Sequence, residues 1–130
     1  MPAATTSIQS VASAVAAYVA RDSAADETVV QLKASAATVH KLLIDNRASG
    51  AVDIVIELFD EVAASVTLGT TAPWLWLTVK AGKTASMDLR NVTDGTGLAT
   101  STALSIAVVT AVNGVAGPAV SPVSVEVQFT

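Results

Sequence analysis

Apolar and polar residues alternate with a period of two through most of the chain after residue 28. The pattern is clearest near the end, where Val123, Val125, Val127 and Phe129 are separated by polar residues. Such alternation is typical of a strand that buries one face in a core. It predicts strands at 30–34, 38–45, 53–60, 66–68, 74–80, 84–89, 103–110 and 123–129.

Short segments rich in turn-forming residues separate the predicted strands. They are residues 46–50, 69–73, 90–97 and 111–122. Gly82 can adopt the positive φ of a two-residue turn at 81–82, so 74–80 and 84–89 are predicted to form a hairpin. The number and spacing of the turns indicate an all-β fold. We expect an antiparallel β-sandwich of about seven to eight strands, immunoglobulin-like or jelly-roll.

One predicted strand carries both tryptophans of the chain. Leu75, Leu77 and Val79 would point into the core, so the other face would present Trp74 and Trp76. A large aromatic pair outside the core needs something to cover it, and tryptophan is enriched at interface hot spots. Both tryptophans are therefore predicted to be interface residues. The alternative, that one or both fold into the core, stays open.

The first 27 residues are treated as an N-terminal arm, and residues 28–130 as the β-sandwich domain. Apolar side chains at helical spacing predict a short amphipathic helix in the arm, followed by a polar hinge at 21–27. The β-branched residues and serines of the arm instead favour an extended segment that adds to a neighbour's sheet. In either form the apolar side chains are candidate contacts with another subunit. They are Ile8, Val11, Val15 and Tyr18.

The composition favours a chain that buries part of its surface against partners. The chain has 130 residues, of which 52% are hydrophobic and 14% charged; the charged share of soluble domains is about 25%. A small Ala/Val/Thr-rich domain would explain this, but a subunit covered by partners explains it better. The net charge is −4 and no lysine/arginine cluster exists, which argues against nucleic acid as a partner.

Several classes of site and location are disfavoured. There are no cysteines and only one histidine, His40, which would lie on an apolar strand face with Leu42 and Ile44. We therefore expect a hydrogen-bonded structural or interface histidine and no metal site. The apolar run 11–20 is too short to span a bilayer, so no membrane association is expected. No basic residue precedes Arg21, which argues against a signal peptide and for a protein made in a cytoplasm.

The acidic residues do not form a catalytic pair. Asp53 and Glu57 are four residues apart on a predicted strand, roughly 13 Å, which is too far to share a reacting bond. Asp60 and Glu61 could hold a cation at a turn, but a solvated strand edge is favoured. Residues 94–97 read as a plain turn, because the carboxylate spacing of a calcium loop is absent. We expect no catalytic residues, no cofactor and no enzymatic activity.

Several short motifs follow one another along the body. They are VQLKASAATV (30–39), IDNRASGA (44–51), ELFD (57–60), the stretch 66–82 and GLATSTALSIA (97–107), before a valine-rich last strand. Their order and spacing resemble a family of small β-sandwich structural proteins of tailed bacteriophages, which includes capsid decoration (cement) proteins. The family has small or aliphatic residues at the positions of Trp74 and Trp76, and acidic residues in the loop occupied here by 113–118. The tryptophans are therefore where this chain would specify its own partner.

The resemblance implies a non-enzymatic virion structural protein. Within that class we expect a decoration protein on the capsid surface, assembled in the host cytoplasm. Its partners would be the major capsid protein and further copies of itself, as a trimer or dimer. The alternatives are a tail or neck adaptor, a fibre-base module and, ranked last, a carbohydrate-binding module that stacks sugars on the two tryptophans.

Overall fold

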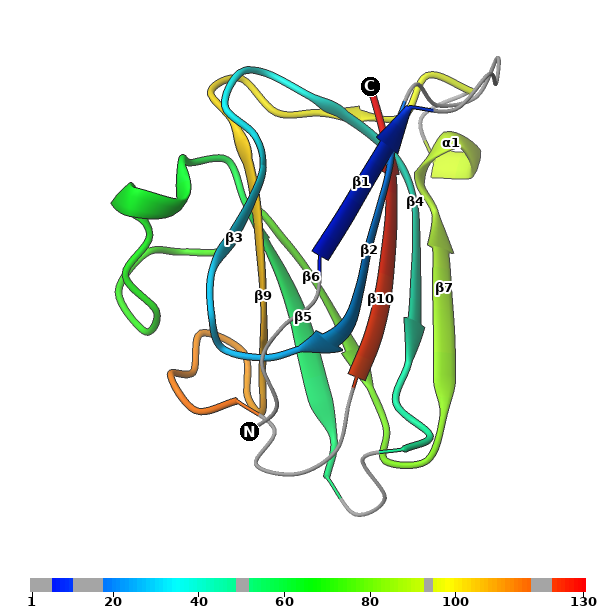
Figure 1. Cartoon of the computed structure of the whole chain (residues 1–130), viewed down its shortest axis with the longest axis vertical. Coiled ribbons are helices and arrows are strands. Elements are labelled where there is room, and N and C mark those ends of the chain that lie inside the picture. Colours follow the sequence, from blue (N-terminus) through cyan, green and yellow to red (C-terminus); the bar gives the residue numbers. More distant parts are fainter. Residues whose placement is uncertain (1–5, 11–17, 49–51, 93–94, 118–122) are drawn as a thin grey trace.

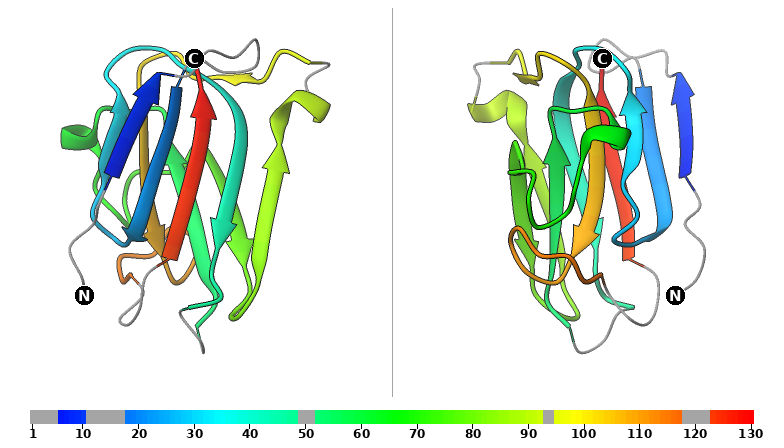
Figure 2. Two further views of the ribbon diagram at one scale, coloured as in Figure 1. Left: turned by 45° about the vertical axis from the view of Figure 1, so that its right-hand side comes forward. Right: turned by 90° about the vertical axis from the view of Figure 1, so that its left-hand side faces the viewer.

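Ten strands in two antiparallel sheets pack face to face in the computed structural model (Figures 1 and 2). The structure describes residues 6–10, 18–48, 52–92, 95–117 and 123–130. A 3-10 helix, η1 (Ala63–Ser65), and one helical turn, α1 (Leu89–Val92), accompany the strands. The strands are β1 (Thr6–Ser10), β2 (Tyr18–Ala25), β3 (Val30–Lys33), β4 (Thr38–Asp45), β5 (Ile54–Phe59), β6 (Leu75–Val79), β7 (Thr84–Asp88), β8 (Leu98–Ala99), β9 (Leu104–Val109) and β10 (Val123–Phe129).

The larger sheet has the order β1-β2-β10-β4-β7, with β8 also paired to β4, and the smaller sheet has the order β3-β9-β5-β6. Every pairing is antiparallel. The expected all-β antiparallel sandwich is therefore confirmed. The last strand, β10, lies between β2 and β4 in the interior of the larger sheet (Figure 1).

The core lies between the inner faces of the two sheets. Phe129 and Leu42 of the larger sheet are fully buried, as are Ile56, Leu58 and Leu104 of the smaller one. The alternation predicted for the last strand is confirmed, because its apolar residues are buried and Ser124 is exposed. In β5 and β9 every residue is buried, so both faces of the centre of the smaller sheet are covered.

The segment treated as an arm contributes two strands to its own chain's sheet. β2 pairs with both β1 and β10, and Val19 and Ala20 are buried. Of the two alternatives, the described residues adopt the extended one, and they pair within the chain. The helix is wrong for these residues, because main-chain bonds to β10 and burial of alternate side chains outweigh the helical spacing. The expected hinge at 21–27 is also wrong, since β2 continues to Ala25.

Three local predictions fail for identifiable reasons. Residues 66–68 are not a strand, because their main chain bonds locally: Val66 N–H to Ala63 O, and Thr70 and Thr71 N–H to Thr67 O. The turn at 81–82 does not close a hairpin, although Gly82 has the expected positive φ of 74°. β6 pairs with β5 and β7 with β4, so the turn carries the chain from one sheet to the other.

The third failure concerns the face of His40. The pairing of β10 with β4 steps from Lys41 to Val39, which makes His40 the extra residue of a β-bulge. Because the bulge shifts the alternation by one residue, Val39 joins Leu42 in the core, whereas the sequence pattern placed His40 on that face.

Candidate interaction surface

The strands β6 and β7 form one open side of the sandwich. β6 is an edge of the smaller sheet and β7 an edge of the larger one, and residues 80–83 connect them (Figure 2). Between these edges the inward-facing residues Leu75, Leu77, Ala85 and Met87 pack on the core but are only partly buried. On this side of the described structure, main-chain groups of the two edge strands and partly buried apolar side chains remain available to a partner.

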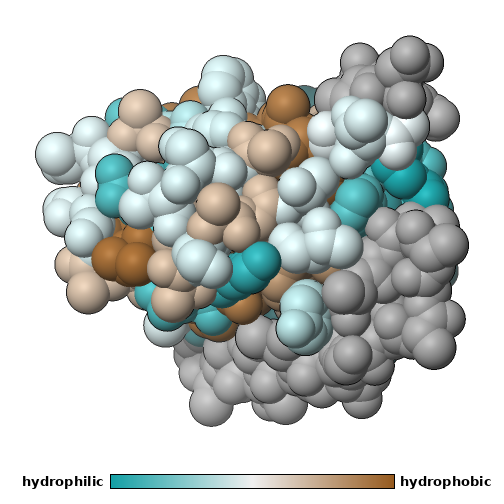
Figure 3. Space-filling view, turned by 90° about the horizontal axis from the view of Figure 1, so that it is seen from above, coloured by the Kyte–Doolittle hydropathy of each residue, from teal (hydrophilic) through white to brown (hydrophobic). Residues whose placement is uncertain are grey.

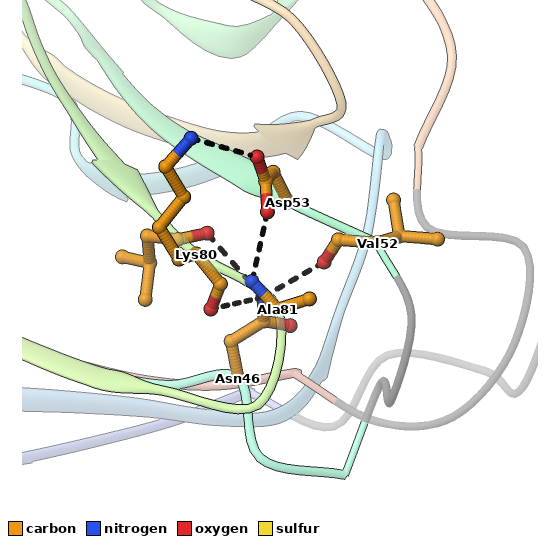
Figure 4. A network of polar contacts seen from close by, with 6 residues as sticks. Asn46, Val52, Asp53, Lys80 and Ala81 are labelled. Atoms are coloured by element: carbon orange, nitrogen blue, oxygen red, sulfur yellow. Dashed lines mark hydrogen bonds and ion pairs between the residues drawn. The ribbon is translucent and has the colours of Figure 1, made fainter.

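A network around Asn46 fixes the end of this open side (Figure 4). The Asn46 side chain is completely buried. Its amide Nδ2 lies 2.9 Å from Val52 O, 3.2 Å from Lys80 O and 3.4 Å from Val79 O. The main chain adds bonds from Asn46 N–H to Lys83 O (2.9 Å) and from Gly82 N–H to Asn46 O (3.2 Å). One residue at the end of β4 thus holds the start of β5, the end of β6 and the connecting turn together.

Asp53 fastens the same turn from outside. Its carboxylate accepts hydrogen bonds from Ala81 N–H (2.9 Å) and from the Lys80 ammonium (3.1 Å), as Figure 4 shows. The Ala81 bond, followed by the Lys80 bond, lowers the pKa of Asp53. Asp53 is therefore a local clamp of the turn that positions β6 and β7.

β6 itself is an uncharged edge strand with a regular register. Trp76 is 49% exposed and Thr78 is exposed, while Leu75 and Leu77 are half-buried and Val79 is buried. Its pairing with β5 runs without a register shift. Natural edge strands are usually protected by charges, proline or bulges. β6 has none of these between Leu75 and Val79, so it is suited to contact another polypeptide.

The outer face beside Trp76 is covered by the chain's own loops. Glu57 lies opposite Trp76 in the ladder and is only 1% exposed. It accepts a hydrogen bond from Asn113 N–H (2.8 Å), and burial raises its pKa, opposed by that bond. A Cβ added at Gly69 would lie 2.7 Å from Val115 Cγ1, so the loops at 60–74 and 110–117 meet over this face. Trp76 lies outside this cover.

The structure separates the residues that the sequence grouped as contacts. Trp74 is partly buried against the core, and its main-chain N–H donates to Leu58 O (2.8 Å). Tyr18, on the other sheet, is 39% exposed and stacks on Phe129 with the ring centroids 5.5 Å apart. Ile8 lies opposite Ala20 in the β1–β2 ladder, while Val11 and Val15 lie outside the described residues. Trp76 therefore stands apart from Trp74 and Tyr18.

The acidic turn residue Asp60 is a structural clamp. Its two carboxylate oxygens accept hydrogen bonds from Ser101 N–H and Oγ, from Thr102 N–H and from Ala103 N–H, at 2.7–3.2 Å. Burial alone would raise its pKa, but the hydrogen bonds together lower the pKa to about 2. These donors occupy the positions that a cation would need. Sequence reasoning missed this role because the donors come from a distant loop.

His40 lies in the β-bulge of β4 and contacts Thr130. Its Nε2 lies 3.3 Å from Thr130 Oγ1, and its buried Nδ1 has no hydrogen-bond partner among the described residues. Burial, followed by the charge of Arg90, lowers its pKa, and Asp88 opposes this. Within the described ranges no three His, Asp or Glu side chains gather where they could hold a metal ion.

A groove of about 560 Å³ crosses the outer face of the larger sheet, and no sequence motif indicated it. An ion pair of Arg21 with Glu126 (2.8 Å) lies in it, beside Leu43 and the hydroxyl groups of Ser86 and Ser124. These lining residues alternate with core residues along four strands. Seen from the end near the C-terminus, most of the described surface has intermediate hydropathy (Figure 3), in keeping with the low charged share.

No family model matches the chain, and comparisons with curated proteins and with solved structures find no match. In the part of the chain that the structure describes, no helix has the length and apolar character needed to cross a membrane.

Proposed function

We propose that this chain is a non-enzymatic virion structural protein that decorates the capsid of a tailed bacteriophage and stabilises the assembled shell. The motif resemblance of residues 30–129 supports the class, and the β-sandwich agrees with it. The observation that carries the proposal is β6, an edge strand without charge or register shift that presents a half-exposed Trp76. A protein with this edge is equipped for assembly with other polypeptides.

The physical basis of stabilisation is mass action. A protein that binds the assembled shell, and not its separate subunits, raises the stability of the shell in proportion to the logarithm of its concentration. An edge strand supplies main-chain hydrogen bonds for such assembly, and an aromatic side chain supplies a desolvated anchor. The carbohydrate-binding alternative needs a two-tryptophan platform, but Trp74 packs against the core, so only Trp76 is presented.

The test is co-sedimentation of the purified chain with expanded capsids of the phage whose genome encodes it. Trp76→Ala is expected to weaken capsid binding by a factor of about 30 or more, the effect of a hot-spot residue. Val112→Ala, which truncates an apolar side chain that is 46% exposed in the loop 110–117, is the matched control and is expected to bind like the parent.

The copy number in purified particles separates the capsid from the tail. A decoration protein is present in proportion to the major capsid protein, whereas a tail or neck adaptor is present in the small number set by a single tail. Absence of the chain from particles, or equal binding by the parent and Trp76→Ala, would overturn the proposal. Circular dichroism of Trp76→Ala is expected to match the parent, because the side chain lies outside the core.

A further inference from the structure

β6 differs from the opposite edge of its own sheet. β3, at that edge, carries Lys33 and has a register shift between Gln31 and Lys33 in its pairing with β9. Both features discourage pairing with another strand. β6 has an unbroken register with β5 and no charge from Leu75 to Val79. Of the two edges, β6 is therefore the one open to a further strand.

The side-chain pattern of β6 is self-complementary. An antiparallel pairing of two copies about a two-fold axis at Leu77 places Leu77 opposite itself and Leu75 opposite Val79 on the inner face. On the outer face Trp76 lies opposite Thr78, and the two Trp76 rings become diagonal neighbours, a separation of roughly 7–8 Å that aromatic side chains bridge. Half-buried apolar residues thus meet apolar residues across the axis.

We infer that the partner of β6 is the β6 strand of a second copy of this chain, so that the two smaller sheets join into one continuous sheet. The inference rests on the proposed function only in assigning a protein contact to β6. A two-fold contact of this kind uses the same patch on both subunits and closes after two copies. It would cover Trp76 and the remaining exposed parts of Leu75 and Leu77. Trp76→Ala would then weaken capsid binding by separating the two copies of a bivalent ligand.

Charge does not oppose a second copy at this edge. Each chain carries a net charge of −4, which opposes self-association at most surfaces. Between Leu75 and Val79 no acidic residue is present. The next pair outward would place Lys80 of one copy opposite Trp74 of the other, and this lysine already pairs with its own Asp53. No like charges would therefore be opposed along the paired strands.

The register is tested by single cysteines in the full chain, which has none of its own. Leu77→Cys is expected to form a disulfide-linked dimer under mild oxidation, because residue 77 meets itself at the axis. Leu75→Cys is the matched control: it lies on the same face of the same strand, but residue 75 meets residue 79. Crosslinking by both variants or by neither would overturn the inferred pairing. Thermal melts confirm that both variants are folded.

The association itself is tested by light scattering of the isolated chain, without capsids. The parent is expected at twice its 13.1 kDa mass. Thr78→Lys puts a charge on the edge and is expected to raise the dimer dissociation constant by at least about tenfold. Ser86→Lys, the same change at an exposed position of β7, is expected to leave it unchanged. If the parent is a monomer at concentrations up to about 100 µM, at which a dimer with a micromolar dissociation constant would be detected, the inference is refuted. Shell binding would then still be decided by co-sedimentation with capsids.

Discussion

Replacing Asn46 by alanine should destabilise the sandwich more than any surface change at the same turn. The substitution removes a buried amide that lies within 3.4 Å of three carbonyl oxygens, those of Val52, Val79 and Lys80. The shorter two contacts are counted as hydrogen bonds of about 1 kcal/mol each, and unsatisfied buried groups add a further penalty. We expect the free energy of unfolding to fall by about 2–4 kcal/mol.

The assay is urea unfolding followed by circular dichroism, supported by thermal melts. For a chain of 130 residues, each kcal/mol lowers the melting temperature by about 3–5 °C, so a decrease of about 6–20 °C is expected. Asp53→Asn is the control, because it weakens the exposed ion pair to Lys80 and keeps an oxygen for Ala81 N–H. Its expected cost is small, because exposed ion pairs contribute little to stability.

The comparison of the two variants decides whether the buried amide joins the sheets. If Asn46→Ala costs less than about 1 kcal/mol, or no more than Asp53→Asn, the carbonyl groups are satisfied in another way. The interpretation of Asn46 as the residue that joins β4 to β5 and β6 would then be wrong. Amide exchange adds a local readout, since the expected loss should increase exchange in the turn at 80–83.

Two further predictions concern pH. Because the pKa of Asp60 falls to about 2 in the fold, its stabilisation is present above its unfolded pKa of 3.8 and is lost as the pH falls through about 2; solvent screening keeps this contribution to at most about 2 kcal/mol. Asp60→Asn should therefore flatten the acid limb of the stability profile measured by urea unfolding between pH 2 and 7, and an unchanged limb would contradict the assignment. Burial raises the pKa of Glu57, so its ionisation opposes folding as the pH rises from the unfolded value of 4.5 to the higher folded value. Glu57→Gln keeps an acceptor for Asn113 N–H, and its stability relative to the parent should be higher at pH 7 than at pH 4. An equal stability difference at both pH values would refute this.

Much of the fold could be predicted because it depends on local alternation. The last strand was predicted with its buried face correct, since a strand with one face in the core must alternate at every position. The same reasoning identified Trp76 as a side chain outside the core. Trp74 was placed with it by the same period, but it precedes β6, where the strand alternation no longer sets the direction of a side chain.

The errors have one physical origin: the strand with which a segment pairs is not determined by the local sequence pattern. The tight turn at 81–82 has the residues of a hairpin, but which sheet β7 joins is decided by β4 and by the buried Asn46. The bulge at His40 is one extra residue, which a period-two pattern cannot show in advance. Asn46 looked like a turn residue, because two of its three acceptors, at 79 and 80, are far away in sequence.

The interior position of β10 has a consequence for the order in which the molecule is completed. β10 is the last strand along the chain, yet it separates β2 from β4, and Thr130 exchanges two main-chain hydrogen bonds with Thr38 (2.9 and 3.0 Å). During synthesis β2 and β4 therefore wait for a partner made roughly 80 residues or more later, and both expose open edges until then. Such long-range pairing is slow and leaves nascent chains prone to aggregation. The sandwich therefore closes when β10 becomes available for pairing, rather than when the first strands emerge.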